Sequence, residues 1–158
     1  MLNLIKTSQT AWPVGITTSK CIKGFVETFF QLLDSGTSEG AKQWSELWIP
    51  TTGEFHAFGI IYKGREEIKG YLLDCHKNLP GLDHSPKKVY FNSADGMDLT
   101  IITSYKFTSP NGKYVSGESA ALFEFEEQDS KVSVRVCRLI IDPNPLLSEF
   151  VAAVAAHE

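Results

Sequence analysis

Apolar and polar residues alternate along most of the second half of the chain, and this pattern predicts four consecutive antiparallel strands. Short segments rich in Gly, Asn, Asp and Ser separate the strands, and Asn111-Gly112 is a strong hairpin signal because both residues tolerate positive φ. Four neighbouring long strands favour a curved sheet that can enclose a pocket. The predicted strands span 87–93, 97–108, 113–127 and 131–142.

The first half shows helical periodicity instead. Apolar residues from Ile22 to Leu33 recur at helical spacing, and Asp34 to Gly36 end that helix. Pro13 and Gly15 interrupt any pattern over residues 1–16, which we expect to form an extended arm. The other expected elements are helices over 38–48, 65–77 and 145–156, a strand over 54–62, and a loop with two prolines over 79–86.

This order of elements predicts an α+β fold: a curved, mostly antiparallel sheet wrapped around helices to form a cone with an internal pocket. A chain of 158 residues is long enough to bury a real core, and we expect a single domain over 1–158. Apolar residues make up 42% and charged residues 22%, as in ordinary globular proteins.

Charge and cysteine content exclude several classes of function. The formal charge is −4 and the 15 Lys and Arg residues are scattered, which argues against nucleic-acid binding. No apolar run approaches the ~18 residues of a membrane span, and no signal peptide is evident. Three separate cysteines favour a reducing compartment, so we expect a cytoplasmic protein. Nucleotide-binding glycine motifs and metal-ligand spacings of His are absent, so no cofactor and no metal are expected.

Two segments carry a family resemblance. Segment 44–70 contains "WSELWIPTTGEFHAFGIIYKGREEIKG", and segment 130–142 reads "SKVSVRVCRLIID". They resemble SnoaL-like proteins, in which a helix ends in an aromatic residue, a turn opens a strand, Gly-Arg-Glu-Glu-Ile starts the next helix, and the last strand commonly ends in Asp. Here Thr51-Thr52-Gly53 replaces the usual Asp-Gly turn, and an Ala-rich tail follows Pro145.

The resemblance covers about residues 17–145 and implies the cone-shaped fold that SnoaL-like proteins share with ketosteroid isomerase, scytalone dehydratase and nuclear transport factor 2. Members of this group include polyketide cyclases, dehydratases, isomerases, epoxide hydrolases and non-catalytic binding modules. The fold therefore does not determine the reaction.

Strand alternation selects side chains that face the predicted pocket. One face of 97–108 carries Thr103 and Tyr105, and small residues at 117, 119 and 121, including Ser119, leave room for a ligand. Glu118 points outward unless a bulge at Gly117 reverses the alternation. In the last strand, Arg138 and Asp142 share the parity of the predicted core face. The opposite face is too apolar for water and predicts a homodimer through Ser133, Arg135, Cys137, Leu139 and Ile141.

His56 is the main acid–base candidate, because it shares strand parity with Phe58 and Tyr62 and histidine exchanges protons near neutral pH. Tyr105 is the candidate donor to a developing oxyanion, with a packed core aromatic as the alternative. Asp142 is expected to orient His56, and Arg138 to hold a substrate oxygen, unless the two form a structural ion pair.

Three further residues have weaker claims. His76 and His84 are both expected near the pocket mouth, and Asp34 is interpreted as a helix cap. The complete candidate set consists of catalytic His56, Asp142 and Tyr105, with Arg138, Phe58, Tyr62, Phe29, Thr103, Ser119, Glu118 and His76 in substrate binding.

These observations support a cofactor-independent isomerase, cyclase or dehydratase that acts on a hydrophobic polyketide or terpenoid-type intermediate. The resemblance raises this hypothesis above the others. The main alternative is a non-catalytic module that binds a small apolar ligand or a protein partner. Other enzymes of the fold, such as an epoxide hydrolase, remain a third possibility.

Overall fold

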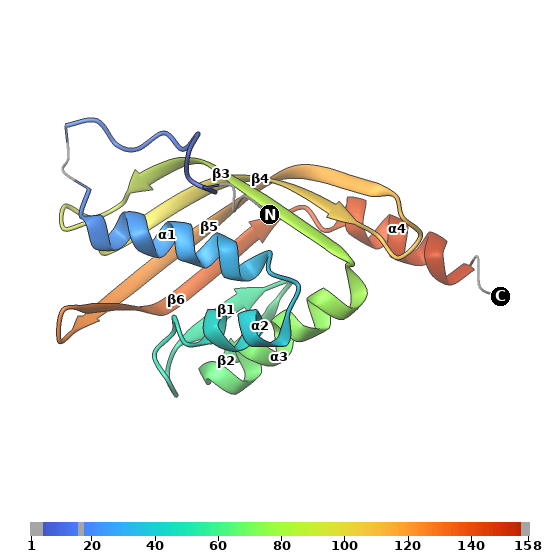
Figure 1. Cartoon of the computed structure of the whole chain (residues 1–158), viewed down its shortest axis with the longest axis horizontal. Coiled ribbons are helices and arrows are strands. Elements are labelled where there is room, and N and C mark those ends of the chain that lie inside the picture. The colour runs from blue at the N-terminus through green and yellow to red at the C-terminus, as the bar shows by residue number, and fades with distance from the viewer. Residues whose placement is uncertain (1–4, 16–17, 156–158) are drawn as a thin grey trace.

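The computed structural model describes residues 5–15 and 18–155, and side chains as far as Glu149 (Figure 1). Six strands form one open sheet in the order β2-β1-β6-β5-β4-β3. Strand β1 pairs with β6 in parallel, and every other neighbouring pair is antiparallel. The elements are α1 (Lys20–Leu33), α2 (Ser38–Ser45), β1 (Glu54–Ala57), β2 (Ile60–Lys63), α3 (Gly64–Asn78), β3 (Gly81–Phe91), β4 (Asp98–Thr108), β5 (Tyr114–Gln128), β6 (Lys131–Ile141) and α4 (Asn144–Ala155).

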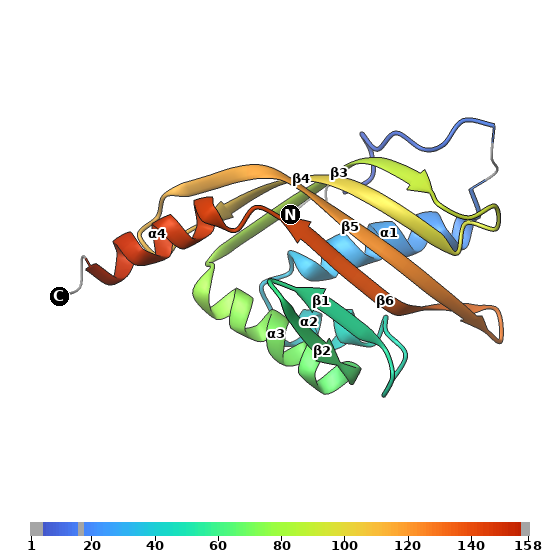
Figure 2. The ribbon, with the colours of Figure 1, turned by 180° about the vertical axis from the view of Figure 1, so that it is seen from behind.

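Helices α1, α2 and α3 cover one face of the curved sheet, and the long strands lie in front of α1 when the molecule is seen from behind (Figures 1 and 2). The predicted α+β cone architecture is therefore confirmed. Helix α1 begins where Ser19 accepts a hydrogen bond from the Ile22 amide, and its apolar face packs on β5. The Phe25 ring, for example, meets Phe125 edge-on at 4.8 Å between centroids.

Arg65 ties the end of α2 to the start of α3. Its guanidinium donates to the Trp48 and Glu46 carbonyls, each at 2.9 Å, and so satisfies carbonyls that follow a helix C-terminus. Helix α2 ends at Ser45 rather than at Trp48 as expected, yet Trp48 is fully buried beside Trp44. This arrangement fixes the wall of the cone that carries β1 and β2.

The strand predicted over 54–62 is a hairpin instead. Phe58 and Gly59 both have positive φ, 53° and 79°, which is the geometry of a two-residue turn that matches the twist of its flanking strands. His56 therefore pairs with Ile61 across the hairpin, while Phe55 pairs with Tyr62 on the inner face. The prediction that His56 shares one wall with Phe58 and Tyr62 is wrong, because the chain reverses between them.

The loop predicted over 79–86 is also wrong beyond its first two residues. Strand β3 begins at Gly81 and pairs with β4 along its length, with one irregularity between Pro86 and Lys88. Proline lacks an N–H, and β3 tolerates it because it is the edge strand of the sheet. Part of the N-terminal arm covers this edge, since Ala11 bridges to β3 through hydrogen bonds with Lys87 and Val89.

Strand β6 contains a bulge that the sequence did not indicate. Glu124 pairs with Val136 but Phe125 pairs with Val134, so Arg135 is an extra residue. The alternative of a bulge at Gly117 does not occur, because β4 and β5 stay in continuous register from Asp98 to Thr108.

Beyond the bulge, each side chain of β6 points to the face of the sheet opposite to the one that strict alternation predicts. Cys137, Leu139 and Ile141 turn toward the cavity, whereas Arg138 turns to the outer face and pairs there with Glu124. The prediction that Arg138 points inward is therefore wrong. The predicted dimer face is also wrong, because it contains Cys137, Leu139 and Ile141. Within the described ranges, no helix is long and apolar enough to cross a membrane.

Candidate functional site

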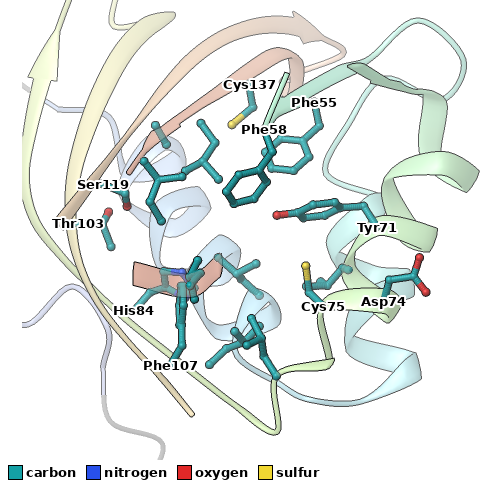
Figure 3. Close-up of a pocket in the computed structure, with 18 of the residues that line it drawn as sticks. Phe55, Phe58, Tyr71, Asp74, Cys75, His84, Thr103, Phe107, Ser119 and Cys137 are labelled. Atoms are coloured by element: carbon teal, nitrogen blue, oxygen red, sulfur yellow. The ribbon is translucent and has the colours of Figure 1, made fainter. Parts of the chain in front are cut away.

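A cavity of about 640 Å³ lies between the inner face of the sheet and the helices (Figure 3). This volume is in the usual range for small-molecule sites. Aromatic and aliphatic side chains form most of its wall, and the first residues of α4 contribute Leu146 and Leu147. The fold thus provides an apolar container with few polar groups, so each polar group facing it carries information.

His84 is the titratable group held most firmly in this wall. Its Nδ1 lies 2.5 Å from Asp34 Oδ1, and its backbone N–H donates to Asp34 Oδ2 at 2.7 Å. Both side chains are nearly buried, at 12% exposed for His84 and 6% for Asp34. The ring also packs between Phe30 and Phe107. The imidazole is therefore fixed in position by a carboxylate on one side and by aromatic rings around it.

The Asp34 contact also determines which nitrogen of the neutral His84 ring carries the lone pair. A carboxylate can only accept a hydrogen bond, so the neutral ring donates through Nδ1 and leaves Nε2 unprotonated. No described residue forms a hydrogen bond with Nε2, and His84 lines the cavity. In the neutral ring, Nε2 is therefore the nitrogen that can accept a proton, and Asp34 is placed to stabilise the imidazolium that such a step would form.

Two residues with hydroxyl groups line the same cavity from neighbouring strands. Thr103 on β4 and Ser119 on β5 are directly paired across the sheet, and both line the cavity (Figure 3). Thr103 is 2% exposed, and its Oγ1 has no hydrogen-bond partner among the described residues. A buried hydroxyl without a partner is costly, and beside a cavity it is a candidate hydrogen-bond donor to a ligand oxygen.

The thiols of the wall and the Tyr71 phenol stay neutral. Burial raises the pKa of the Cys75 thiol to about 11 and raises the pKa of Cys137 further. Burial also raises the pKa of the Tyr71 phenol well above its ordinary value. A thiolate or phenolate nucleophile is therefore disfavoured. Asp74 also lines the cavity but is exposed, so His84 is the enclosed candidate for proton transfer.

Five sequence-predicted residues lie in the cavity wall. They are Phe29 from α1, Phe58 and Tyr62 from the hairpin, and the paired Thr103 and Ser119. The positions of Thr103 and Ser119 follow from the alternation of uninterrupted strands, and that of Phe29 follows from the apolar face of α1. Phe58 reaches the cavity from the tip of the hairpin, beside Phe55 (Figure 3).

Other predicted residues lie elsewhere. His56 is outside the cavity wall, where its Nε2 contacts Glu54 Oε2 at 2.9 Å and this hydrogen bond lowers the pKa of Glu54. Asp142 is exposed and accepts hydrogen bonds from the backbone and side chain of Asn144 at the start of α4. The expected contact of Asp142 with His56 is absent. Glu118 is exposed on the outer face, since no bulge occurs at Gly117.

Tyr105 and His76 are packing residues. The Tyr105 ring stacks on Phe107 at 4.5 Å and covers Gly117, where an added Cβ would lie 2.6 Å from the phenol oxygen. The pKa of Tyr105 is raised by burial and by the nearby charge of Asp142. His76 contacts the Leu33 carbonyl through Nε2 at 2.9 Å. Neither residue lines the cavity.

His84 and Asp34 are the acid–base candidates that the structure brings together, whereas the sequence indicates only a helix cap and a loop histidine. Asp34 does follow α1 as a cap residue, and its second role depends on a partner 50 positions away. A usable signal was the position of His84 between two prolines, four residues after Pro80 and two before Pro86. Among residues 5–15 and 18–155, no group of three or more His, Cys, Asp and Glu side chains is arranged to hold a metal ion.

Comparisons with known proteins identify the fold. No family model and no curated protein sequence matches the chain. A candidate SnoaL-like polyketide cyclase from Shewanella denitrificans is 11% identical with a TM-score of 0.63, covering 85% of this chain and 99% of that one. A candidate scytalone dehydratase from Novosphingobium aromaticivorans is 12% identical with a TM-score of 0.65, covering 76% and 80%.

A third similar structure is a hypothetical protein with a ketosteroid isomerase-like fold from Catenulispora acidiphila, in complex with trimethylamine. It is 15% identical with a TM-score of 0.65, and the match covers 84% of this chain and 93% of that one. Identities this low establish the fold alone. The resemblance predicted from sequence is confirmed at that level: the chain has the cone fold shared by SnoaL-like, scytalone dehydratase-like and ketosteroid isomerase-like proteins.

Proposed function

We propose that the protein is a cofactor-independent isomerase, cyclase or dehydratase that acts on a hydrophobic intermediate of polyketide or terpenoid type. One observation carries this proposal: His84 lines an otherwise apolar cavity with its Nδ1 held by the carboxylate of Asp34, an arrangement that leaves Nε2 as the nitrogen without a hydrogen-bond partner among the described residues. Proton transfer is the reaction that such a pair performs best. The similarity in fold to a candidate cyclase and a candidate dehydratase is consistent with it.

In this mechanism Nε2 of His84 removes a proton from a carbon next to a carbonyl or similar group. The C–H electrons form a new double bond, and the charge that develops on the oxygen is stabilised by the hydroxyls of Thr103 and Ser119. Isomerisation ends when His84 returns the proton to another carbon. Dehydration ends when the proton goes to a leaving hydroxyl, which departs as water. Asp34 stabilises the transient imidazolium in both cases.

We therefore propose that other residues take the expected roles. His84 takes the acid–base role first given to His56, and Asp34 takes the orienting role first given to Asp142. Thr103 replaces Tyr105 as the candidate hydrogen-bond donor to the substrate oxygen. The apolar wall, including Phe29, Phe58 and Tyr62, favours a hydrophobic substrate whose few oxygens lie toward His84 and Thr103.

A non-catalytic binding module is the alternative. The same apolar cavity supports it, and the Catenulispora protein of this fold holds a small molecule, trimethylamine. The two functions differ in what they require of His84. A carrier needs the volume and the apolar wall, whereas an acid–base enzyme also needs the unprotonated Nε2.

A generic carbon acid tests the proposal without knowledge of the natural substrate. A nitrobenzisoxazole loses its ring C–H proton to a base while its N–O bond breaks, and the coloured phenolate that forms reports the rate. Because general base catalysis contributes about 10²–10⁴-fold, His84→Gln is expected to lower the rate by at least ~10²-fold. His56→Gln is the matched control and is expected to leave the rate unchanged. Equal rates for wild type and His84→Gln, with retained binding of the compound, would favour the carrier.

We also propose that the protein forms a homodimer through the outer face of the sheet. Ile102, Ala120 and Ile140 are aligned across β4, β5 and β6 on that face, and Ile140 is 60% exposed. Exposed apolar residues at the centre of a sheet face favour association.

Cys21, Cys75 and Cys137 are free thiols, which supports the proposed cytoplasmic location.

A further inference from the structure

We propose that Lys6, in the N-terminal arm, is a positioning residue that holds Asp34 in the orientation His84 requires. The inference rests on the proposed acid–base function and adds a residue that lies outside the cavity wall. Lys6 Nζ lies 2.7 Å from Asp34 Oδ2 and 2.9 Å from Asp83 Oδ1. Its side chain is 19% exposed, so the ammonium is mostly withdrawn from water.

Asp34 occupies a place where a carboxylate needs a cation. It follows the last residue of α1, at the negative end of the helix dipole, and the last turn of α1 contains no basic residue. Its Oδ1 faces the imidazole Nδ1 of His84, and its Oδ2 accepts from the His84 backbone N–H and contacts Lys6. The contact from Lys6 thus offsets the unfavourable helix end without occupying the oxygen that orients the ring.

The charges around Lys6 make it a firm partner. Burial alone lowers the pKa of Lys6, but the hydrogen bonds and charges of Asp34 and Asp83 outweigh burial and raise it above the ordinary value. The groups that face one another here are Lys6, Asp34, Asp83 and His84. The ammonium is therefore retained over the whole range in which the protein is expected to work.

The arm is fixed at several other points, which makes Lys6 part of a built structure. Glu27 of α1 accepts from the backbone N–H groups of Lys6 and Thr7 at 2.8 Å each, and from the Thr7 hydroxyl at 2.7 Å. Thr10 donates to the Pro86 carbonyl at 2.7 Å, and Ala11 bridges to β3. The arm therefore joins α1, which carries Asp34, to β3, which carries His84.

Loss of this contact is expected to impair turnover more than binding. Lys6 does not line the cavity, so an apolar compound should bind to a Lys6 variant with unchanged affinity. A small displacement of a catalytic group can slow a reaction by up to about 10²-fold. We expect Lys6→Met to lower kcat for the nitrobenzisoxazole by about 10-fold or more with little change in KM, and Lys6→Arg to restore most of the rate.

The experiment compares Lys6→Met, Lys6→Arg and His84→Gln in the full chain. The matched control is Lys131→Met, a change of an exposed lysine at the first position of β6. A second readout is independent of turnover: the downfield proton resonance of the His84 Nδ1–H, assigned by its loss in His84→Gln. It is expected to persist in Lys6→Arg and Lys131→Met and to weaken or move in Lys6→Met.

The outcomes separate the two proposals. If His84→Gln keeps the wild-type rate, the proposed function fails whatever Lys6 does. If His84→Gln loses the rate while Lys6→Met keeps both the rate and the resonance, only the role of Lys6 is overturned. A drop in Lys6→Met that Lys6→Arg does not restore, with the resonance unchanged, also overturns it. If Lys6→Met does not fold, the decision rests on Lys6→Arg, which must retain the rate and the resonance.

Discussion

The hydroxyl of Thr103 gives a prediction in which stability and activity change in opposite directions. Thr103→Val keeps the shape of the side chain and removes an oxygen that is buried without a partner in the described structure. An unsatisfied buried hydroxyl costs about 1–3 kcal/mol, so the valine variant should gain about 1 kcal/mol in its free energy of unfolding. For a chain of this size that gain corresponds to a rise in Tm of roughly 2–4 °C.

The same change should slow catalysis. If Thr103 donates to the oxygen on which charge develops, its loss should lower the rate of nitrobenzisoxazole opening by about 10²-fold. Urea denaturation followed by far-UV circular dichroism measures stability, with an expected rise of about 0.5 M in the midpoint. The rate is measured on the same preparations. A variant that is more stable and much slower identifies the hydroxyl as functional.

Thr10→Val provides the matched control. The Thr10 hydroxyl already donates to the Pro86 carbonyl at 2.7 Å, so its removal should reduce stability by about 1 kcal/mol and leave the chemistry unchanged. The reasoning is refuted if Thr103→Val is destabilised as much as Thr10→Val, which would mean that its hydroxyl is satisfied. A more stable Thr103→Val with the wild-type rate would refute the proposed hydrogen bond from Thr103 to the substrate oxygen.

Three further predictions concern packing, pH and assembly. Gly117→Ala places a Cβ 2.6 Å from the Tyr105 oxygen and should cost about 1–3 kcal/mol by thermal unfolding, less in a Tyr105→Phe background. Burial raises the pKa of Cys75 from 9.0 to about 11, so the folded state holds this proton more tightly than the unfolded state. Stability should therefore be unaffected below about pH 9 and fall by up to about 2 kcal/mol toward pH 11, with a shallower fall in Cys75→Ala. Ile140→Asp should convert the proposed dimer to a monomer in size-exclusion chromatography with light scattering, and a wild-type monomer at tens of micromolar would contradict the dimer.

The inner faces of β4 and β5 could be predicted from sequence because nothing interrupts their alternation. Thr103 and Ser119 lie in the cavity wall, as expected. Strand β6 could not be predicted in this way, since one extra residue at Arg135 reverses the direction of every later side chain. Arg135 and Arg138 both pair with Glu124 on the outer face, and such cross-strand pairing is invisible in the local pattern.

The acid–base pair was missed for a different reason. Pro80 and Pro86 suggested a loop around His84, but an edge strand accepts proline, and the pairing of β3 with β4 turns His84 inward. At 54–62 the sequence predicts a continuous strand that includes His56, whereas the structure has a hairpin. Phenylalanine is an unusual residue at a turn position with positive φ, so the sequence does not indicate this turn. Local patterns identified the container, whereas the contact of His84 with Asp34 depends on packing between distant segments.

A crystal structure of the protein with a bound naphthol tests the central claim most directly, because this apolar ligand carries a single oxygen. The account predicts that its rings fill the apolar cavity and that its oxygen lies within hydrogen-bond distance of His84 Nε2 or Thr103 Oγ1, with the His84–Asp34 contact retained. An oxygen directed to Asp74 and Asn78 on α3, with His84 untouched, would contradict the claim that His84 is the chemical centre of the site.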